Sequence, residues 1–227
     1  MNILLTGASR GIGAAAAEAL AAAGAHVVLA ARTAADLEAV EERIHRAGGT
    51  ATIAPLDLIE TDGIARLATA VAERWGKLDL LMLNAATLGT LTPVAQIDGK
   101  EFSRVLTLNV LASQALIAGF DPLLRKSEAG LVLAVTSSVG RRPRAYWGAY
   151  GASKAALETL ALTYAEEVRN VSSVRVAIVD PGSTATTMRA RAFPGEDPAT
   201  LKPPSAVAEA VVALIRRGFE TGERLEV

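Results

Sequence analysis

A tyrosine and a lysine four positions apart, Tyr150 and Lys154, are the residues of this sequence best suited to proton transfer. In an α-helix, positions i and i+4 share one face, so the ammonium of Lys154 lies beside the phenol of Tyr150. Two unit charges about 5 Å apart attract by ~3 kcal/mol at an effective dielectric constant of about 20, which favours tyrosinate by about two pKa units. We therefore expect Lys154 to bring the pKa of Tyr150 down into the working range of a general acid. The spacing alone is weak evidence, because it also arises by chance.

A glycine-rich turn near the start of the chain is a second, independent motif. Residues 2–5 form a short apolar run, Thr-Gly-Ala-Ser-Arg-Gly-Ile-Gly follows at residues 6–13, and an alanine-rich helical pattern continues to about residue 23. A strand that turns through glycines into a helix presents backbone amides and the positive end of the helix dipole to a phosphate. The sequence therefore predicts a dinucleotide site. The residues expected to contact the dinucleotide are Thr6, Gly7, Ser9, Arg10, Gly11, Ile12 and Gly13.

Together the two motifs resemble the short-chain dehydrogenase/reductase (SDR) family, in its smaller single-domain branch. The resemblance runs from residue 2 to about residue 188 and includes the family patterns Thr-Gly-x-x-x-Gly-x-Gly and Tyr-x-x-x-Lys. The active-site serine of the family stands three residues before a glycine, as Ser137 does before Gly140, and its upstream asparagine is matched by Asn109. The resemblance implies a catalytic tetrad of Asn109, Ser137, Tyr150 and Lys154.

The reaction that the resemblance implies is hydride transfer between a nicotinamide and a carbonyl or secondary alcohol, as in ketone and aldehyde reductases and alcohol dehydrogenases. Ser137 would bind the substrate oxygen and Tyr150 would act as the general acid or base. Lys154 would contact the nicotinamide ribose and lower the pKa of Tyr150, while Asn109 would position a water that links Lys154 to solvent.

The end of the second expected strand indicates the choice of cofactor. An NAD site places a carboxylate there for the ribose hydroxyls, whereas a 2′-phosphate calls for arginine. This strand ends Leu-Ala-Ala-Arg at Arg32, and Arg10 in the glycine turn can approach the same phosphate. We expect NADP(H) to be preferred over NAD(H), unless both arginines are ordinary surface charges.

The resemblance implies further cofactor contacts along the chain. One motif departs from the family pattern, since Ala86 stands where Asn-Ala-Gly would place a glycine. A methyl group there restricts the backbone, so we expect a slightly altered path near the adenine ribose. The further contacts are Asp57 and Leu58 at the adenine, Asn84 and Ala85 near its ribose, Tyr150 and Lys154, and Pro181, Gly182, Thr184 and Thr186 at the carboxamide.

Length and composition indicate one compact domain, which the resemblance implies is a single NAD(P)-binding catalytic domain over residues 1–227. The chain is 51% hydrophobic, its formal net charge is −1, and it contains no cysteine and only two histidines, which lie far apart in sequence. These values give no reason to expect a nucleic acid or an anionic membrane as a partner, or a metal site. We find no leader pattern and no charge-free apolar run of membrane-spanning length, and we therefore expect a cytoplasmic protein.

Apolar runs alternate with helical patterns, which predicts an α/β fold, a Rossmann-type doubly wound parallel sheet. Thr33 and Asp36 are interpreted as a capping pair for the second helix. Strands are predicted at 2–6, 26–30, 51–56, 78–83, 131–136, 174–179 and 224–227, and helices at 11–23, 34–47, 62–75, 99–125, 149–170 and 205–218.

Two loops, 140–148 and 187–204, are expected to border the substrate pocket. Both combine arginines with aromatic residues, which suits an anionic or aromatic carbonyl compound, although arginines on loops are more often simply solvated. The sequence does not name the ketone or alcohol. We expect a homodimer or homotetramer, and favour the dimer because the final segment is shorter than in many family members.

Two other functions remain open. A cofactor-binding regulator or sensor would keep the fold with little turnover, but it has no need of Ser137, Tyr150 and Lys154 together. A sugar-nucleotide epimerase or dehydratase shares Tyr-x-x-x-Lys, but its glycine spacing differs and it normally carries an additional sugar-binding domain.

Overall fold

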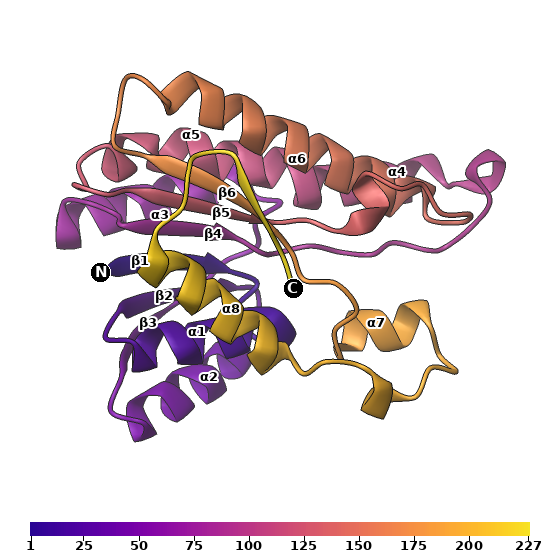
Figure 1. Ribbon diagram of the computed structural model, residues 1–227, viewed down its shortest axis with the longest axis horizontal. Coiled ribbons are helices and arrows are strands. Elements are labelled where there is room, and N and C mark those ends of the chain that lie inside the picture. Colours follow the sequence, from indigo (N-terminus) through magenta and orange to yellow (C-terminus); the bar gives the residue numbers. More distant parts are fainter.

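The computed structural model describes residues 1–227, apart from the side chain of Thr61. Its centre is a parallel sheet of seven strands in the order β3-β2-β1-β4-β5-β6-β7 (Figure 1). This confirms the predicted α/β, Rossmann-type sheet. The strands are β1 (Asn2–Thr6), β2 (His26–Ala31), β3 (Thr50–Pro55), β4 (Leu80–Leu83), β5 (Leu131–Val135), β6 (Arg175–Asp180) and β7 (Glu223–Glu226).

The central strands are continuous apolar runs because both of their faces are covered. All residues of β4 and β5 are buried, and Leu4 of β1 pairs with Val28 on one side and Leu81 on the other. The chain order reverses between β1 and β4, since β2 and β3 extend the sheet one way and β4 to β7 the other. A ligand crevice is expected at such a switch point, beyond the carboxyl ends of the strands.

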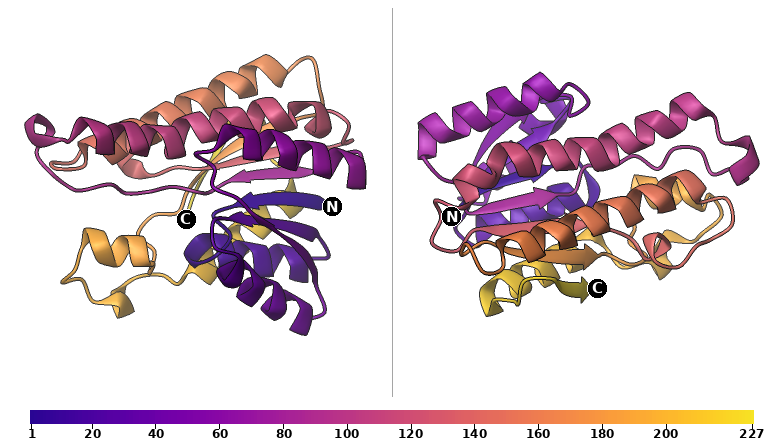
Figure 2. Two further views of the ribbon diagram at one scale, coloured as in Figure 1. Left: turned by 180° about the vertical axis from the view of Figure 1, so that it is seen from behind. Right: turned by 90° about the horizontal axis from the view of Figure 1, so that it is seen from above.

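Helices cover the two faces of the sheet as separate layers (Figures 1 and 2). One face packs against α1 (Gly11–Ala22), α2 (Ala34–Arg46) and α8 (Pro204–Arg217), whose apolar residues share one core cluster. The other face packs against α3 (Thr61–Trp75), α5 (Ala112–Leu124) and α6 (Gly148–Val168) in a second cluster.

The predicted helix at 99–125 is interrupted in the structure. It consists of α4 (Gly99–Leu106), a π-helical segment Thr107–Leu111 and α5. Single π-helical turns inside α-helices are rare and are frequently found at functional sites. A 3.6-residue hydrophobic period does not reveal such a change, so the sequence predicted one uniform helix.

Two further predictions need correction. The loop at 187–204 contains a short helix, α7 (Thr187–Ala192), and a 3₁₀ turn at Pro198–Thr200, and 3₁₀ turns also occur at Val94–Gln96 and Ser138–Gly140. Thr33 occupies the N-cap of α2, but its side chain makes no capping hydrogen bond. The other predicted boundaries lie within two residues of those observed.

One helical stretch, Gly99–Leu124, is long and apolar enough to cross a bilayer by length and composition alone, with a mean hydropathy of 1.2. Its α5 part contributes Leu116, Phe120 and Leu124 to the core cluster between the sheet and α3, α5 and α6. Packing inside the fold therefore accounts for much of its apolar content.

Candidate active site

A cleft of about 940 Å³ lies at the predicted switch point. Each sequence-predicted site residue lines it except Thr6 and Asn109. The fold thus brings the glycine turn after β1, the ends of β2, β4, β5 and β6, and the start of α6 to one place.

The glycine turn is shaped by close backbone approach. Gly7 and Gly11 have φ of +67° and +57°, a region that other residues rarely adopt. A Cβ on Gly13 would lie 2.1 Å from the carbonyl oxygen of Gly7 and 2.7 Å from Nδ2 of Asn84. No residue larger than glycine fits at Gly13 without moving the turn.

The N-terminus of α1 suits a phosphate. Its N-cap, Arg10, makes no side-chain capping bond, and no acidic residue occupies the first turn. First-turn amides of a helix need outside partners, and an anion there is also favoured by the helix dipole. With the glycines beside it, this arrangement fits the pyrophosphate of a dinucleotide.

Thr6, which was predicted to contact the cofactor, is buried and does not line the cleft. The side chain is 1% exposed, and its Oγ1 donates to the carbonyl of Met82 at 3.1 Å. The same oxygen accepts from the backbone N–H groups of Asn84 and Ala85 at 3.1 and 3.2 Å. Thr6 therefore joins the ends of β1 and β4 and positions the turn.

Ala86 requires no special backbone conformation. Among the described residues, Tyr146 is the single non-glycine with positive φ. Ala86 therefore has a backbone conformation that alanine adopts readily, and the altered path near the adenine ribose stays a prediction. The preceding Asn84 holds the turn, since its Nδ2 donates to the carbonyls of Thr6 at 2.9 Å and Gly7 at 3.2 Å.

Arg10 and Arg32 both line the cleft, at the end expected to hold the adenosine. Both are exposed in its wall, and no ion pair engages either within the described part of the chain. Thr33 and Asp36, which the sequence assigned to helix capping, also line this end. In the sequence, Thr33 directly follows Arg32 and Asp36 follows Arg32 by four residues. This closeness to Arg32 was the signal that could have placed both residues at the site.

Asp57 lines the cleft and also stabilises its own turn. Its Oδ1 accepts from the backbone N–H of Ile59 at 3.1 Å. The Asp57 carboxylate thus stabilises the turn from Asp57 to Ile59 by a hydrogen bond, and Asp57 also lines the cleft.

The side chains that were predicted to be catalytic converge from two elements. Ser137 directly follows β5, and Tyr150 and Lys154 lie on the first turns of α6. Tyr150 is 7% exposed and Lys154 is 2% exposed, and both still reach the cleft wall. Thr136, beside Ser137, also lines the cleft, and its buried Oγ1 has no hydrogen-bond partner among the described residues. An unpaired buried hydroxyl is typical of a site built for a polar ligand.

The pKa of Tyr150 was expected to be lowered by Lys154, but the folded protein raises it. The Nζ of Lys154 donates to the carbonyl of Val135 at 2.8 Å and lies 5.7 Å from the centre of the Tyr150 ring. Burial, together with the negative charge of Asp180, raises the pKa of Tyr150 above its usual value. Burial also lowers the pKa of Lys154 to about 8. Desolvation of both groups outweighs their mutual attraction at this separation.

Asn109 is a positioning residue. It lies in the π-helical segment and is fully buried. Its Nδ2 donates to the carbonyl of Thr87 and to Oγ of Ser153, both at 2.9 Å, and its Oδ1 accepts from the N–H of Thr87 at 2.8 Å. Ser153 Oγ donates in turn to the carbonyl of Tyr150 at 2.7 Å. Both side-chain N–H groups of Asn109 thus join the loop after β4 to the first turns of α6. The water that Asn109 was predicted to position would have to bind another atom of this residue.

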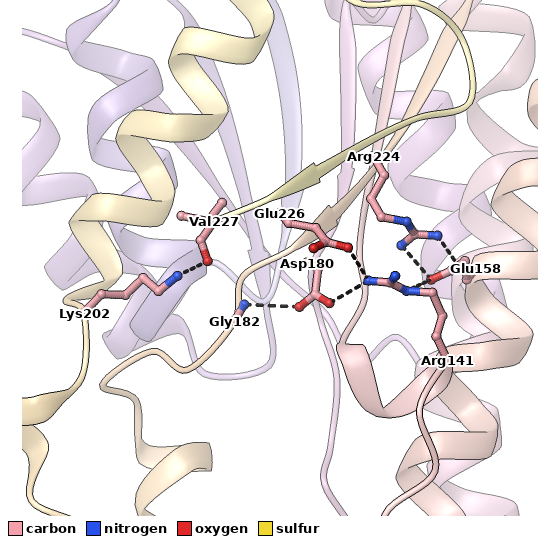
Figure 3. A network of polar contacts seen from close by, with 8 residues as sticks. All are labelled: Arg141, Glu158, Asp180, Gly182, Lys202, Arg224, Glu226 and Val227. Atoms are coloured by element: carbon pink, nitrogen blue, oxygen red, sulfur yellow. Dashed lines mark hydrogen bonds and ion pairs between the residues drawn. The ribbon is translucent and has the colours of Figure 1, made fainter.

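A network of charged residues joins the loop after β5, the strands β6 and β7, and α6 (Figure 3). Arg141 Nη2 lies 3.1 Å from Asp180 Oδ2 and 2.8 Å from Glu226 Oε1. Asp180 Oδ1 accepts from the N–H of Gly182 at 3.1 Å, and Glu158 of α6 pairs with Arg224. Sequence reasoning placed Arg141 at the substrate pocket and overlooked Asp180, although Asp180 directly precedes Pro181 of the expected carboxamide-binding segment.

Comparison with known proteins identifies the family of this chain. Residues 1–197 match the family described as short chain dehydrogenase. The chain is 39% identical over 208 residues to the uncharacterized oxidoreductase YciK of Escherichia coli (strain K12), covering 90% of this chain and 82% of YciK. It is also similar to a short-chain dehydrogenase structure from Pseudomonas syringae, with 41% identity, 99% and 93% of the two chains covered and a TM-score of 0.96.

A further similar structure, from Escherichia coli CFT073, is a complex with NADPH, and shares 38% identity at a TM-score of 0.91, over 99% and 95% of the two chains. The family match, the fold and the conjunction of the glycine turn with Ser137, Tyr150 and Lys154 lead to one conclusion. This chain belongs to the short-chain dehydrogenase family and is an SDR oxidoreductase.

Proposed function

We propose that the protein is an NADP(H)-dependent oxidoreductase that interconverts a ketone or aldehyde and the corresponding alcohol. The observation that carries the proposal is that Ser137, Tyr150 and Lys154 line the same cleft as the glycine turn. The NADPH bound by the similar structure from Escherichia coli CFT073 supports the choice of cofactor.

The chain offers partners for each part of the dinucleotide. The glycine turn and the N-terminus of α1 would hold the pyrophosphate, and Lys154 and Thr186 would hold the nicotinamide end. When bound, the cofactor supplies a hydride donor or acceptor. The preference for NADP(H) rests on two guanidinium groups, Arg10 and Arg32, in the wall of the cleft, although the carboxylates of Asp36 and Asp57 line the same cleft.

Tyr150 would deliver the proton in the reducing direction. A phenol whose pKa is raised by burial stays protonated, while Ser137 donates a hydrogen bond to the same substrate oxygen. As the proton leaves, a tyrosinate forms beside Lys154. A lysine with a pKa of about 8 is mostly charged at pH 7, so its ammonium stabilises that anion when it develops.

The test begins with fluorescence titrations of the protein with NADPH and NADH, followed by a panel of ketones and aldehydes with NADPH absorbance as readout. We expect tighter binding of NADPH and turnover of some member of the panel. Tyr150→Phe should lower turnover at least about 10²-fold with NADPH affinity nearly unchanged.

Tyr164→Phe is the matched control, because the Tyr164 hydroxyl contacts Asp121 at 2.6 Å outside the cleft. Near-normal turnover in Tyr150→Phe would overturn the role of Tyr150. Tight NADPH binding with no turnover across the panel would instead favour a cofactor-binding regulator.

A further inference from the structure

A second cavity, of about 390 Å³, adjoins the catalytic cleft. The two share Ser137, Trp147, Gly182 and Arg189 in their walls. Because Ser137 lies in the shared wall, the second cavity opens at the end of the cleft where the substrate carbonyl would sit. The second cavity can therefore hold the part of a substrate molecule that extends beyond its carbonyl group.

Two charges in the wall of this cavity are already compensated. Asp180 is 5% exposed and is held by Arg141 and by the N–H of Gly182. Arg189 makes a two-pronged ion pair with Glu196, with N–O distances of 2.5 and 2.6 Å. These pairs leave little net charge for a ligand to meet.

Two other arginines of the wall are not compensated. Arg142 and Arg144 also line the cavity, and neither forms an ion pair or hydrogen bond through its guanidinium within the described residues. The nearby carboxylates of Glu226 and Glu196 are taken by Arg141 and Arg189. The cavity therefore has an excess of positive charge next to the hydroxyl of Ser137.

Arg142 and Arg144 are exposed, and the guanidinium of Arg144 lies over an aromatic ring. Its Cζ lies 5.3 Å from the centre of the Phe193 ring, whose other close cation is Arg189 at 3.9 Å. Phe193 lies 5.7 Å from Trp147, and Trp147 lies 5.9 Å from Tyr150. This row of rings joins the segment after α7 to the catalytic helix. A guanidinium stacked on an aromatic ring is preorganised for an anion.

We propose that Arg142 and Arg144 bind an anionic group of the substrate in this second cavity. The preferred substrates are then carbonyl compounds that carry a carboxylate or phosphate, with an aromatic or apolar body against Trp147. This inference rests on the proposed function, since the anionic group is placed relative to a carbonyl at Ser137 and Tyr150.

The kinetic test compares 4-carboxybenzaldehyde with methyl 4-formylbenzoate, which share the ring and the aldehyde but differ in charge. We expect kcat/KM with NADPH to be about tenfold or more higher for the carboxylate, because an arginine–carboxylate pair is charge-assisted. In the double variant Arg142→Gln/Arg144→Gln, kcat/KM for the carboxylate should fall to that for the ester. The value for the ester should stay unchanged. 4-Formylphenyl phosphate in a parallel series shows which anion is preferred.

Arg216→Gln is the matched control, since Arg216 is an exposed arginine on α8 that lines neither cavity. It should leave the ratio unchanged. Equal kcat/KM for the charged and neutral aldehydes, or a ratio that survives in the double variant, would overturn the inference while leaving the reductase function standing.

A binding measurement decides the case in which none of the three aldehydes is reduced. Benzoate and inorganic phosphate are titrated by calorimetry into the protein saturated with NADP⁺. We expect one of them to bind, and the double variant, but not Arg216→Gln, to lose the signal. Absence of binding by both anions to the unchanged protein would overturn the inference, whereas failure of the proposed function would show as anion binding without turnover of any carbonyl.

Discussion

The guanidinium of Arg141 donates to the carboxylate of Asp180 across 3.1 Å, between residues that are 39 positions apart in sequence. Arg141 follows Ser137 by four residues, and Asp180 ends β6 immediately before Pro181 and Gly182, which we propose contact the cofactor. The same guanidinium reaches Glu226 of β7 (Figure 3). One ion pair thus joins the turn that carries Ser137 to the strand end that precedes the cofactor contacts.

We predict that Arg141→Gln destabilises the protein by about 2 kcal/mol, because it leaves the buried carboxylate of Asp180 without its cation. The charge of Asp180 raises the pKa of Tyr150, so removing Arg141 should raise that pKa further. In the proposed mechanism alcohol oxidation requires deprotonated Tyr150, so the pH profile of this reaction should shift to higher pH.

Addition of Asp180→Asn to Arg141→Gln should reverse the shift of the pH profile. Arg169→Gln, which breaks an exposed pair with Glu166, is the control and should change neither quantity appreciably. An unshifted profile in Arg141→Gln would show that this ion pair has no electrostatic effect on Tyr150.

Burial of Lys154 predicts a particular dependence of stability on pH. Its pKa is about 8 in the folded chain and 10.5 when unperturbed, so between these values the unfolded chain holds a proton that the folded chain has released. Stability therefore rises with pH in that window, because the unfolded state binds more protons. Below about pH 8 the cost of the buried charge is present in full.

Urea denaturation without cofactor measures this effect. Between pH 8 and pH 10 the free energy of unfolding should rise by about 1–2 kcal/mol relative to Lys154→Met, which has no such group to titrate. Parallel curves for the two proteins would mean that Lys154 is solvated, contrary to its 2% exposure.

Arg32→Asp should discriminate between the cofactors. The substitution puts a second carboxylate beside Asp36 and removes a guanidinium from the adenosine end of the cleft. We expect NADPH affinity to fall by at least about tenfold and NADH affinity to change much less, because NADPH alone carries the 2′-phosphate. Arg66→Asp, in an exposed arginine of α3 that lines neither cavity, is the control. Equal losses for both cofactors would exclude phosphate recognition by Arg32.

Gly13→Ala should abolish cofactor binding, because its methyl group would lie 2.1 Å from the carbonyl oxygen of Gly7. The turn must then move, and we expect loss of NADPH binding in fluorescence titration together with a fall in the melting temperature. Gly99→Ala is the comparison, since a Cβ at this helical glycine meets nothing within 4 Å. It should be neutral or stabilise by up to about 1 kcal/mol. Unimpaired binding in Gly13→Ala would refute the role given to this turn.

The layered fold was predictable because its signals are local. Strand β1 and the glycine turn are adjacent in sequence, and the i, i+4 spacing of Tyr150 and Lys154 acts within one helix. Apolar runs and helical periods likewise operate over fewer than about 20 residues. Boundaries were therefore close to those observed, except where Asn109 and its partners accompany a π-helical segment.

The roles of several site residues depended on contacts made across the fold. Thr6 had the right sequence context for a cofactor contact, yet its hydroxyl is used by Met82, Asn84 and Ala85, more than 70 residues away. Lys154 had the right spacing to face Tyr150, yet the carbonyl of Val135 takes its hydrogen bond. Spacing along one helix does not reveal which competing acceptor a neighbouring strand supplies.

The sequence by itself determined the family, the parallel sheet and the catalytic and cofactor motifs, because each is a short pattern that acts through backbone conformation or helical spacing. Only the tertiary structure decided the charge balance around them: the pairing of Arg141 with Asp180 and Glu226, the burial that shifts the pKa values of Tyr150 and Lys154, and the two unpaired arginines beside Ser137. Electrostatic effects depend on distance and solvent exposure, and both are set by segments that meet only when the chain has folded.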